Sequence, residues 1–495
     1  MRILDNRILV RRVAVGVCLT AAAVLASCSD FLDPKPNDVL APENFYKSAS
    51  DAVAAVNGVY ESTKWGHWLG YWYMSDIASD DIYASPNFGS DGHRMAEYIF
   101  NASEWPIGDV WGNRYGVINR ANAVLDRVPA IQMDETLKAR VLGEAHYLRA
   151  LAYFELVRFY GDVPLIEHEV KSLANLDVAR APQAQVYALI VSDLQAAIPA
   201  LQDQYSGADL GRVTSGAAKT LLGKVYLQQK NYTQAAQTLG AVIASGRYAL
   251  NTVWKDNFTV SKELVNPESI WEINYDAVAD PGSGSVQTLF SLPSNYPGGD
   301  AYGLMGLVPS LVSLFPAGDQ RGNHGTFMAP PYTDRLGRVV DWTVPNGPAF
   351  DKYLDETSTQ NMTARGWVQQ SNNWIISRFA DVLLMYAEAV NEGGTAGSMS
   401  AVVALDSVRH RAGLPSVGVT GQTALRDSIR VERRREFVFE GQRWNDLSRW
   451  GILDQAIRAK QTEIGVPVKG VPSNLFPIPQ TELDINHKLT QNPGW

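Results

Sequence analysis

The densest gathering of side chains that could bind a ligand lies in the segment 65–83, where aromatic rings are followed by carboxylates. Trp68 and Trp72 are four residues apart, so in a helix they would share one face. The C–H faces of sugar rings stack on aromatic rings, and sugar hydroxyls need short polar side chains such as Asp81 beside them. This mix of residues predicts a carbohydrate-binding surface.

Other interpretations of this segment stay open. The aromatic rings could instead fill the core beside the helix expected over residues 50–61. Asp80 and Asp81 could cap a helix or hold a structural calcium ion, although calcium would need more oxygen ligands in register. No other cofactor is expected.

A second group of aromatic residues lies in a stretch rich in glycine and proline. Residues 276–350 contain 20 Gly and Pro among 75 positions, so loops and short strands are expected there rather than long helices. Loops lie at the surface and often carry function, which favours ligand contact for their aromatic side chains. These candidates are Tyr296, Tyr302, Tyr332 and Trp342.

Catalytic patterns are missing from the sequence. It contains no nucleophile elbow, no zinc-protease motif, no phosphate-binding loop and no dinucleotide fingerprint, and its seven His are scattered. Carboxylates are plentiful, but nothing singles out a glycosidase pair. Arg433, Arg434 and Arg435, with Glu432, Glu436 and Glu440, are expected to support the structure as ion pairs. We therefore expect a binding protein, not an enzyme.

Composition excludes further classes of protein. The 495 residues carry 43 Lys and Arg against 52 Asp and Glu, a net charge of −9 and a pI near 5.4. A nucleic-acid-binding protein needs a basic face, so nucleic acid is not expected as a partner. Two Cys cannot form a disulfide scaffold, and 46% hydrophobic residues permit a large core.

The N-terminus carries an export signal. Four Arg precede the apolar run 13–25, which is too short to span a bilayer and is typical of a secretory signal peptide. The run ends in Leu25-Ala26-Ser27-Cys28, which resembles the lipobox of bacterial lipoproteins. We therefore expect residues 1–27 to be removed, Cys28 to be lipidated, and residues 28–48 to form a tether. The alternative is an ordinary signal peptide with a chance Cys.

Helical periodicity organises the rest of the chain. In 214–227, apolar residues recur at helical spacing after a Thr214 or Ser215 cap, and a partner helix follows the turn at Lys230 and Asn231. This pair matches tetratricopeptide spacing, with a small Gly223 that lets the helices approach. Segment 143–160 is apolar on more than one face, as a helix between two neighbours would be.

These patterns predict a mainly α fold: a scaffold of tetratricopeptide-like helical pairs with a long irregular Gly/Pro-rich insert at 276–350. A second pair of helices is expected over 379–390 and 402–408. We divide the chain into an N-terminal helical region, 49–260, and a C-terminal region, 261–495, that includes the insert.

Several blocks in the same order resemble the SusD/RagB family. They are CSDFLDPKP after the lipobox, EAHYLRALAYFELVRFYGDVPL (144–165), RVTSGAAKTLLGKVYLQQKNYTQA (212–235), SRFADVLLMYAEAVNE (377–392), VERRREFVFEGQRWNDLSRWG (431–451) and LFPIPQTELDINHKLTQNPGW (475–495). Together they cover nearly the whole mature chain. The final Trp495, where Tyr is more usual, is a small departure.

This resemblance implies a SusD-like fold and a place in nutrient uptake. Members are lipoproteins at the surface of the outer membrane that bind glycans without cutting them and cover a SusC-like TonB-dependent transporter through their repeat face. The resemblance therefore implies an oligosaccharide ligand, a transporter partner and a membrane anchor. Peptide-binding members also exist, so peptide capture is the first alternative, and a glycoside hydrolase or a helical-repeat interaction protein without a small ligand are further ones.

Overall fold

The computed structural model describes residues 45–495 except 68, 86–87, 173–176, 276–289, 291, 297–301, 334–336, 343–346, 356–370 and 398. The predicted signal peptide, Cys28 and most of the tether therefore lie outside the described residues, as does Trp68. None of the helices in the described part of the chain has the length and apolar character that crossing a bilayer requires.

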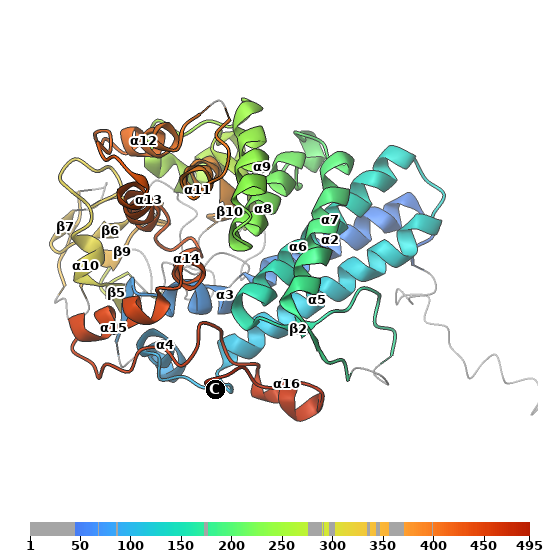
Figure 1. The fold of residues 1–495 in the computed structure, drawn as a ribbon, viewed down its shortest axis with the longest axis horizontal. Helices are drawn as coiled ribbons and strands as arrows, with labels where there is room; N and C mark the ends of the chain where they lie inside the picture. Colours follow the sequence, from blue (N-terminus) through green and yellow to red (C-terminus); the bar gives the residue numbers. More distant parts are fainter. Residues whose placement is uncertain are drawn as a thin grey trace, which may run out of the picture.

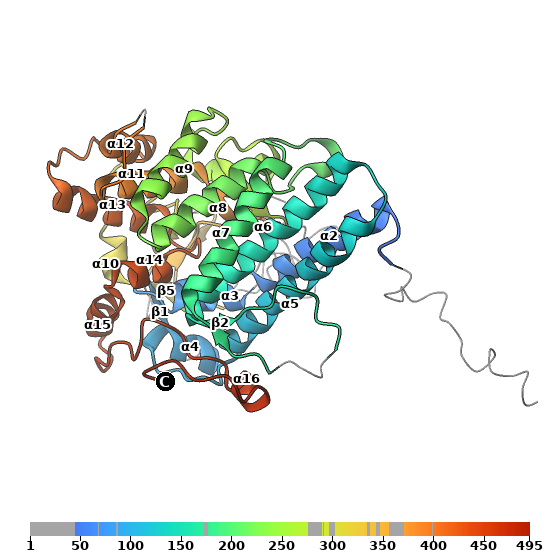
Figure 2. The ribbon, with the colours of Figure 1, turned by 45° about the vertical axis from the view of Figure 1, so that its right-hand side comes forward.

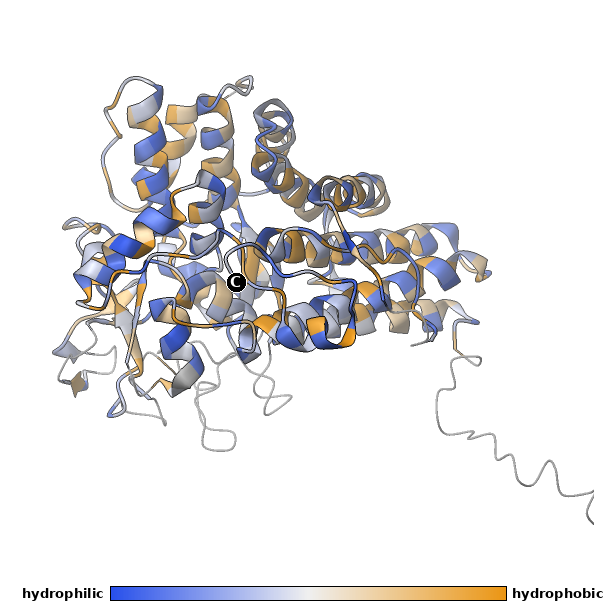
Figure 3. Ribbon diagram, turned by 60° about the horizontal axis from the view of Figure 1, so that its bottom comes forward, coloured by the Kyte–Doolittle hydropathy of each residue, from blue (hydrophilic) through white to orange (hydrophobic). Residues whose placement is uncertain are grey.

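Long helices form one side of the molecule. In Figures 1 and 2, four of them lie side by side: α2 (Ala49–Gly66), α5 (Trp105–Arg127), α6 (Glu135–Tyr160) and α7 (Gln183–Ala200). Helix α6 packs against both α5 and α7, and almost every residue from Val141 to Tyr160 is buried. The prediction of a helix enclosed between neighbours is thereby confirmed. The outer helices alternate hydrophobic and hydrophilic bands, as amphipathic helices do (Figure 3).

The predicted helical pairs are present. Thr214 caps α8 (Ser215–Gln228) by accepting a hydrogen bond from the amide of Ala217, and α9 (Tyr232–Ala244) follows. A Cβ added at Gly223 would lie 2.5 Å from Cγ of Leu239 on α9, so glycine allows the close approach. Helices α11 (Phe379–Asn391) and α12 (Ala401–Arg411) form the second pair, and α11 packs against α9. The expectation of a mainly α, paired-helix scaffold is confirmed.

The C-terminal region adds shorter helices and packs the chain end against the early segment. They are α13 (Gln422–Glu436), α14 (Arg443–Trp450), α15 (Leu453–Glu463) and α16 (Gln480–Ile485). Trp495 stacks on Phe100 with ring centroids 4.9 Å apart, and its indole N–H donates to the Leu475 carbonyl. The last residue thus packs beside α4 (Gly89–Glu97), near which the C-terminus lies in Figure 1.

Short elements make up the described parts of the insert and its flanks, as expected. They are η4 (Trp254–Phe258), η5 (Val260–Val265), β4 (Ser269–Ile273), β5 (Met305–Leu307), α10 (Pro309–Val312), β6 (Phe327–Met328), β7 (Tyr332–Thr333), β8 (Val339–Val340), β9 (Ala349–Phe350) and β10 (Trp374–Arg378). Antiparallel pairs join β4 to β10, β6 to β9 and β7 to β8.

One further ladder connects the insert to the early part of the chain. Strand β1 (Ile82–Ala84) pairs antiparallel with β5, with Ile82 opposite Leu307 and Ala84 opposite Met305. The remaining short elements are α3 (Gly70–Trp72), the π-helix η1 (Tyr73–Ile77), η2 (Val128–Ala130), β2 (Val163–Pro164), β3 (Arg180–Ala181) and η3 (Gly207–Asp209). One hydrophobic core contains buried residues from Ala52 to Leu489. The N-terminal region (49–260) and the C-terminal region (261–495) therefore share a core.

Candidate functional site

Trp72, which the helical spacing placed on a sugar-binding face, is in the core. Its side chain is fully buried, with ring centroids 6.0 Å from Phe290 and 5.5 Å from Phe439. No surface remains on which a sugar could stack, so this assignment is corrected. A four-residue spacing shows that two side chains share a face but leaves open whether that face meets solvent or core. The core-filling alternative is the right one for Trp72.

Asp81 is also engaged inside the protein. Its Oδ1 accepts a hydrogen bond from Nε of Arg434 at 2.7 Å, while both oxygens of Asp80 accept from Arg443 at 2.7 and 2.8 Å. Burial alone would raise the pKa of Asp80, but Arg434 and Arg443 hold that pKa well below its ordinary value. Asp81 therefore ties α13 to the segment before β1 rather than facing a ligand. The described residues contain no group of three or more His, Cys, Asp or Glu arranged for a metal ion.

Three of the four candidate aromatics of the insert serve its own packing. Tyr332 is 4% exposed and stacks on His324 with centroids 4.7 Å apart. Tyr296 and Trp342 are half-buried against a second, small hydrophobic cluster that contains Tyr332. The insert thus has a miniature core of its own, which sequence reasoning treated as surface. Tyr332 is removed from the predicted site, and Tyr296 and Trp342 offer only part of a ring.

Tyr302 is exposed, so its contact with a ligand stays a prediction, and a second exposed ring lies elsewhere in the chain. Among the described residues, Tyr302 and Trp105 are the two aromatic side chains that are more than a third exposed, at 43% and 39%. They lie 197 positions apart in the chain, since one belongs to the insert and the other begins α5.

A continuous row of rings joins these two exposed side chains. Ring centroids lie 5.0 Å apart from Trp105 to Tyr73, 5.6 Å from Tyr73 to Phe88, 5.3 Å from Phe88 to Phe290 and 5.9 Å from Phe290 to Tyr302. Tyr73 and Phe88 are buried and Phe290 is half-buried. The row therefore ends in one exposed ring on each side, with packed rings between them. We call these five side chains the aromatic platform: Trp105, Tyr73, Phe88, Phe290 and Tyr302.

Backbone contacts hold the Tyr302 end of the aromatic platform in place. The amide of Gly303 donates to the Leu292 carbonyl and that of Leu304 to the Phe290 carbonyl, both at 2.8 Å. The Leu304 carbonyl in turn accepts from the amide of Ser85, directly after β1. Together with the β1–β5 ladder, these bonds bring the insert against the segment that carries Tyr73 and Phe88.

Helix geometry fixes the Trp105 end. Pro106 stands in the first turn of α5, where its fixed φ suits a helix start and its missing N–H would have no partner within the helix. Trp105 is therefore held at a helix end, projecting from the surface. Its ring meets Tyr73, the first residue of the π-helix η1. The sequence signal for this position is the Trp-Pro pair that follows Ser103 and Glu104, since Pro is common in the first turn of a helix.

Polar groups border the Trp105 end of the aromatic platform. Nη2 of Arg94 lies 3.1 Å from Oδ1 of Asp91 and 2.5 Å from Oε2 of Glu104. Burial and the Asp91 carboxylate raise the pKa of Tyr73, whose ring contacts Trp105. Asp109 follows Trp105 by one turn of α5, and burial raises its pKa. Rings with carboxylates beside them are the arrangement that sugars require.

Two adjoining hollows of ≈ 310 and ≈ 600 Å³ lie between α2, residues 208–212 and β4, and share Arg212, Trp271 and Glu272. Trp271 is only 4% exposed, and its indole N–H donates to the Gly211 carbonyl at 3.1 Å. Tyr60 and Tyr248 also line these hollows and are half-buried, so neither ring is as exposed as Trp105 or Tyr302.

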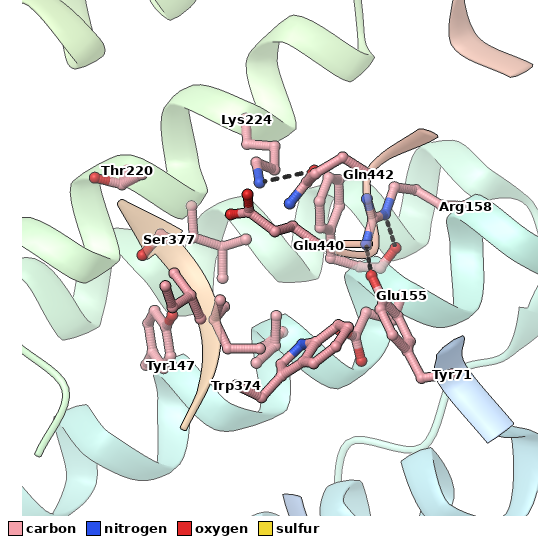
Figure 4. A pocket seen from close by; sticks show the side chains of 15 residues that line it. Tyr71, Tyr147, Glu155, Arg158, Thr220, Lys224, Trp374, Ser377, Glu440 and Gln442 are labelled. Atoms are coloured by element: carbon pink, nitrogen blue, oxygen red, sulfur yellow. Dashed lines mark hydrogen bonds between the residues drawn. The ribbon is translucent and has the colours of Figure 1, made fainter. Parts of the chain in front are cut away.

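An inner cavity, shown in Figure 4, is too small for a sugar. Its volume of ≈ 30 Å³ suits one or two water molecules. Arg158 donates to the hydroxyl of Tyr71 at 3.3 Å and Lys224 to Oε1 of Gln442 at 3.3 Å, as the dashed lines mark. Polar side chains from α6, α8 and the residues before α14 line this cavity.

The charged residues of α13 form buried ion pairs, as expected for a structural role, but with partners from other elements. Glu436 accepts from Arg378 at 2.5 Å and from Arg321 at 2.8 Å. Arg433 contacts Asp381 at 2.9 Å and Asp446 at 2.8 Å. Of the predicted contacts between neighbouring turns of one helix, the pair of Arg435 with Glu432 is present at 3.3 Å.

Comparison with known families identifies the chain. A model described as SusD family matches residues 343–495, and one described as "Starch-binding associating with outer membrane" matches residues 30–227. The chain belongs to the SusD family. This SusD-family protein is 29% identical to "SusD-like protein P2" of Formosa agariphila, over 95% of this chain and 97% of that protein. It is 27% identical to a "SusD-like protein" of Bacteroides ovatus, over 88% and 82%.

Solved structures agree with the assignment of this SusD-family protein. A "Laminarin binding SusD-like protein" is 28% identical with a TM-score of 0.78, covering 91% of this chain and 100% of that one. A SusD superfamily protein from Parabacteroides distasonis is 26% identical with a TM-score of 0.76, covering 90% and 99%. Both the predicted family and the predicted mainly α fold are confirmed.

Proposed function

We propose that this SusD-family protein captures an oligosaccharide on the aromatic platform. The exposed rings of Trp105 and Tyr302 stack on sugar faces, and the Asp91 and Asp109 carboxylates beside Trp105 accept hydrogen bonds from hydroxyls. The observation that carries this proposal is the row of rings with an exposed ring at each end. The similarity to a laminarin-binding relative supports a carbohydrate ligand.

The rest of the proposal concerns location and partner. Cys28 carries the lipid anchor in the outer membrane, and residues 28–48 form the tether that holds the body at the cell surface. The protein covers a SusC-like TonB-dependent transporter and passes its ligand on without breaking a bond. An apolar hollow of ≈ 570 Å³ between α9 and α11, lined by Ala244 and Tyr386 among others, supports a docking role for the helical pairs.

Calorimetry against a panel of oligosaccharides and oligopeptides tests the ligand class. We expect heat of binding with at least one oligosaccharide, and Trp105→Ala and Tyr302→Ala each to weaken it about ten-fold or more, because stacking on one ring contributes about 1–2 kcal/mol. Tyr232→Ala on α9 is the matched control, a half-buried tyrosine of the helical-pair scaffold, and it should leave affinity unchanged.

Other outcomes would replace this function. Binding of oligopeptides with no response to any oligosaccharide would establish peptide capture instead. Sustained release of reducing ends from polysaccharides, lost on replacing a pair of carboxylates, would make the protein a hydrolase. The transporter partner is tested by co-purification from the native membrane, which Ala244→Arg at the hollow between α9 and α11 should abolish.

A further inference from the structure

The charges around the Trp105 end of the aromatic platform are predominantly negative. Asp91, Glu104 and Asp109 contribute three carboxylates, whereas Arg94 is the cation that touches Asp91 and Glu104. Glu104 is 1% exposed at its side chain, while Asp91 and Arg94 are 29% and 37% exposed. The balance of these four groups is two negative charges.

Arg94 has little capacity to bind an anionic ligand. Its Nη2 atom already contacts two carboxylates, so its positive charge is offset before a ligand arrives. The nearest arginine beneath Asp109 is Arg114, which is 1% exposed and donates to Glu155. It cannot reach the surface of the aromatic platform.

We propose that the aromatic platform selects uncharged oligosaccharides and excludes sugars that carry carboxylate or sulfate groups; this inference rests on the proposed function. Carboxylates accept hydrogen bonds from neutral hydroxyls, so the rim suits an uncharged glycan. A uronate or sulfate at the same position meets like charges, and Arg94, the cation that the structure describes beside them, is already paired with two carboxylates. Selection thus comes from repulsion as well as from attraction.

The experiment compares matched pairs of neutral and acidic oligosaccharides of the same length and linkage with the mature protein. We expect the acidic member to bind at least about ten-fold more weakly at low salt, because two like charges act over a short distance. Added NaCl should reduce the difference in affinity between the neutral and the acidic oligosaccharide, because salt screens the repulsion. Affinity for the neutral oligosaccharide should stay constant.

Two variants assign the effect to this rim. Asp91→Asn combined with Asp109→Asn removes both net charges, so the ratio of neutral to acidic affinity should fall about three-fold or more, and this ratio is the readout because both ligands lose the same hydroxyl contacts. Asp427→Asn, an exposed acid on α13, is the control and should change neither affinity. An intact near-ultraviolet dichroism spectrum shows that the double variant is folded.

The outcomes separate this inference from the function beneath it. Tight binding of acidic oligosaccharides, with affinity that falls as salt rises, would overturn charge selection while leaving glycan capture standing. Equal affinity for both members of a pair would also overturn it. No binding of any oligosaccharide would overturn the proposed function itself.

Discussion

At the scale of single residues, the molecule separates aromatic rings that pack from those that meet solvent. The distinction depends on neighbours from distant parts of the chain. Trp72 is covered by Phe290 and Phe439, whereas Trp105 projects from a helix end. The buried arginines also have partners from distant parts of the chain, as the pairs of Arg378 with Glu268 and of Arg433 with Asp381 show.

Arg378 offers the sharpest test of that buried network. It contacts Glu268 and Glu440 at 2.7 Å and is 1% exposed. We expect Arg378→Ala to lower the free energy of unfolding by about 3–5 kcal/mol, because Glu268 and Glu440 would remain buried with one cation fewer, Arg411 and Lys352 being their other partners. Urea denaturation measures this loss. Arg458→Ala, which breaks an exposed pair with Asp454, is the control and should cost less than about 0.5 kcal/mol. A loss below about 1 kcal/mol for Arg378→Ala would contradict the assignment.

At the scale of elements, the sequence predicts helices well because their periodicity is local. The cap at Thr214, the α8–α9 pair and the enclosed helix α6 all follow from spacing within about 15 residues. The candidate site was predicted less well. The exposed ring of Tyr302 was expected because it lies in a Gly/Pro-rich loop, whereas no local pattern indicates that Trp105 is exposed beside Tyr73, 32 positions earlier.

The remaining errors also have physical reasons. Tyr332 was assigned to the surface because the second hydrophobic cluster is assembled from segments up to about 60 residues apart, which no local pattern records. Asp81 was assigned to a ligand because its partner, Arg434, is 353 positions away. Long-range pairing decides which polar and aromatic groups remain for a ligand.

The close packing of α8 on α9 gives a prediction for a single methyl group. Gly223→Ala places a Cβ 2.5 Å from Cγ of the fully buried Leu239, so we expect a net loss of about 1–2 kcal/mol in the free energy of unfolding despite alanine's better helix propensity. Gly112→Ala on α5 has no neighbour within 4 Å and should stabilise by up to about 1 kcal/mol. Thermal denaturation measures the change in melting temperature of each variant. Equal changes for Gly223→Ala and Gly112→Ala would show that Gly223 has no packing role.

At the scale of the whole molecule, buried acids make folding depend on pH. Burial raises the pKa of Asp76 from its ordinary value near 4 to about 8, and Asp81 adds to this effect. The folded protein then keeps a proton that the unfolded chain releases. Stability therefore falls as pH rises between about 4 and 8, by up to about 1.4 kcal/mol per pH unit for this one group.

Asp76→Asn tests this dependence. An asparagine oxygen can still accept from Ser75 and from the amide of Gly441, which the aspartate binds at 3.0 Å each. We expect wild type and variant to have similar stability near pH 4 and the variant to become increasingly more stable towards pH 8. Urea titrations across this range measure the difference, and parallel curves would contradict a raised pKa at Asp76.

Because the β1–β5 ladder has only three residue pairs, the proposed ligand site should open at a lower free energy than the whole protein unfolds. Trp105 and Tyr302 are brought together across 197 positions largely by this ladder and three neighbouring amide bonds, while the main core extends well beyond them. Local opening of a small ladder costs less free energy than global unfolding. Exchange of the β5 amides with solvent deuterium would therefore report on the site separately from the fold. A bound glycan that contacts both Trp105 and Tyr302 would stabilise the closed ladder and slow that exchange.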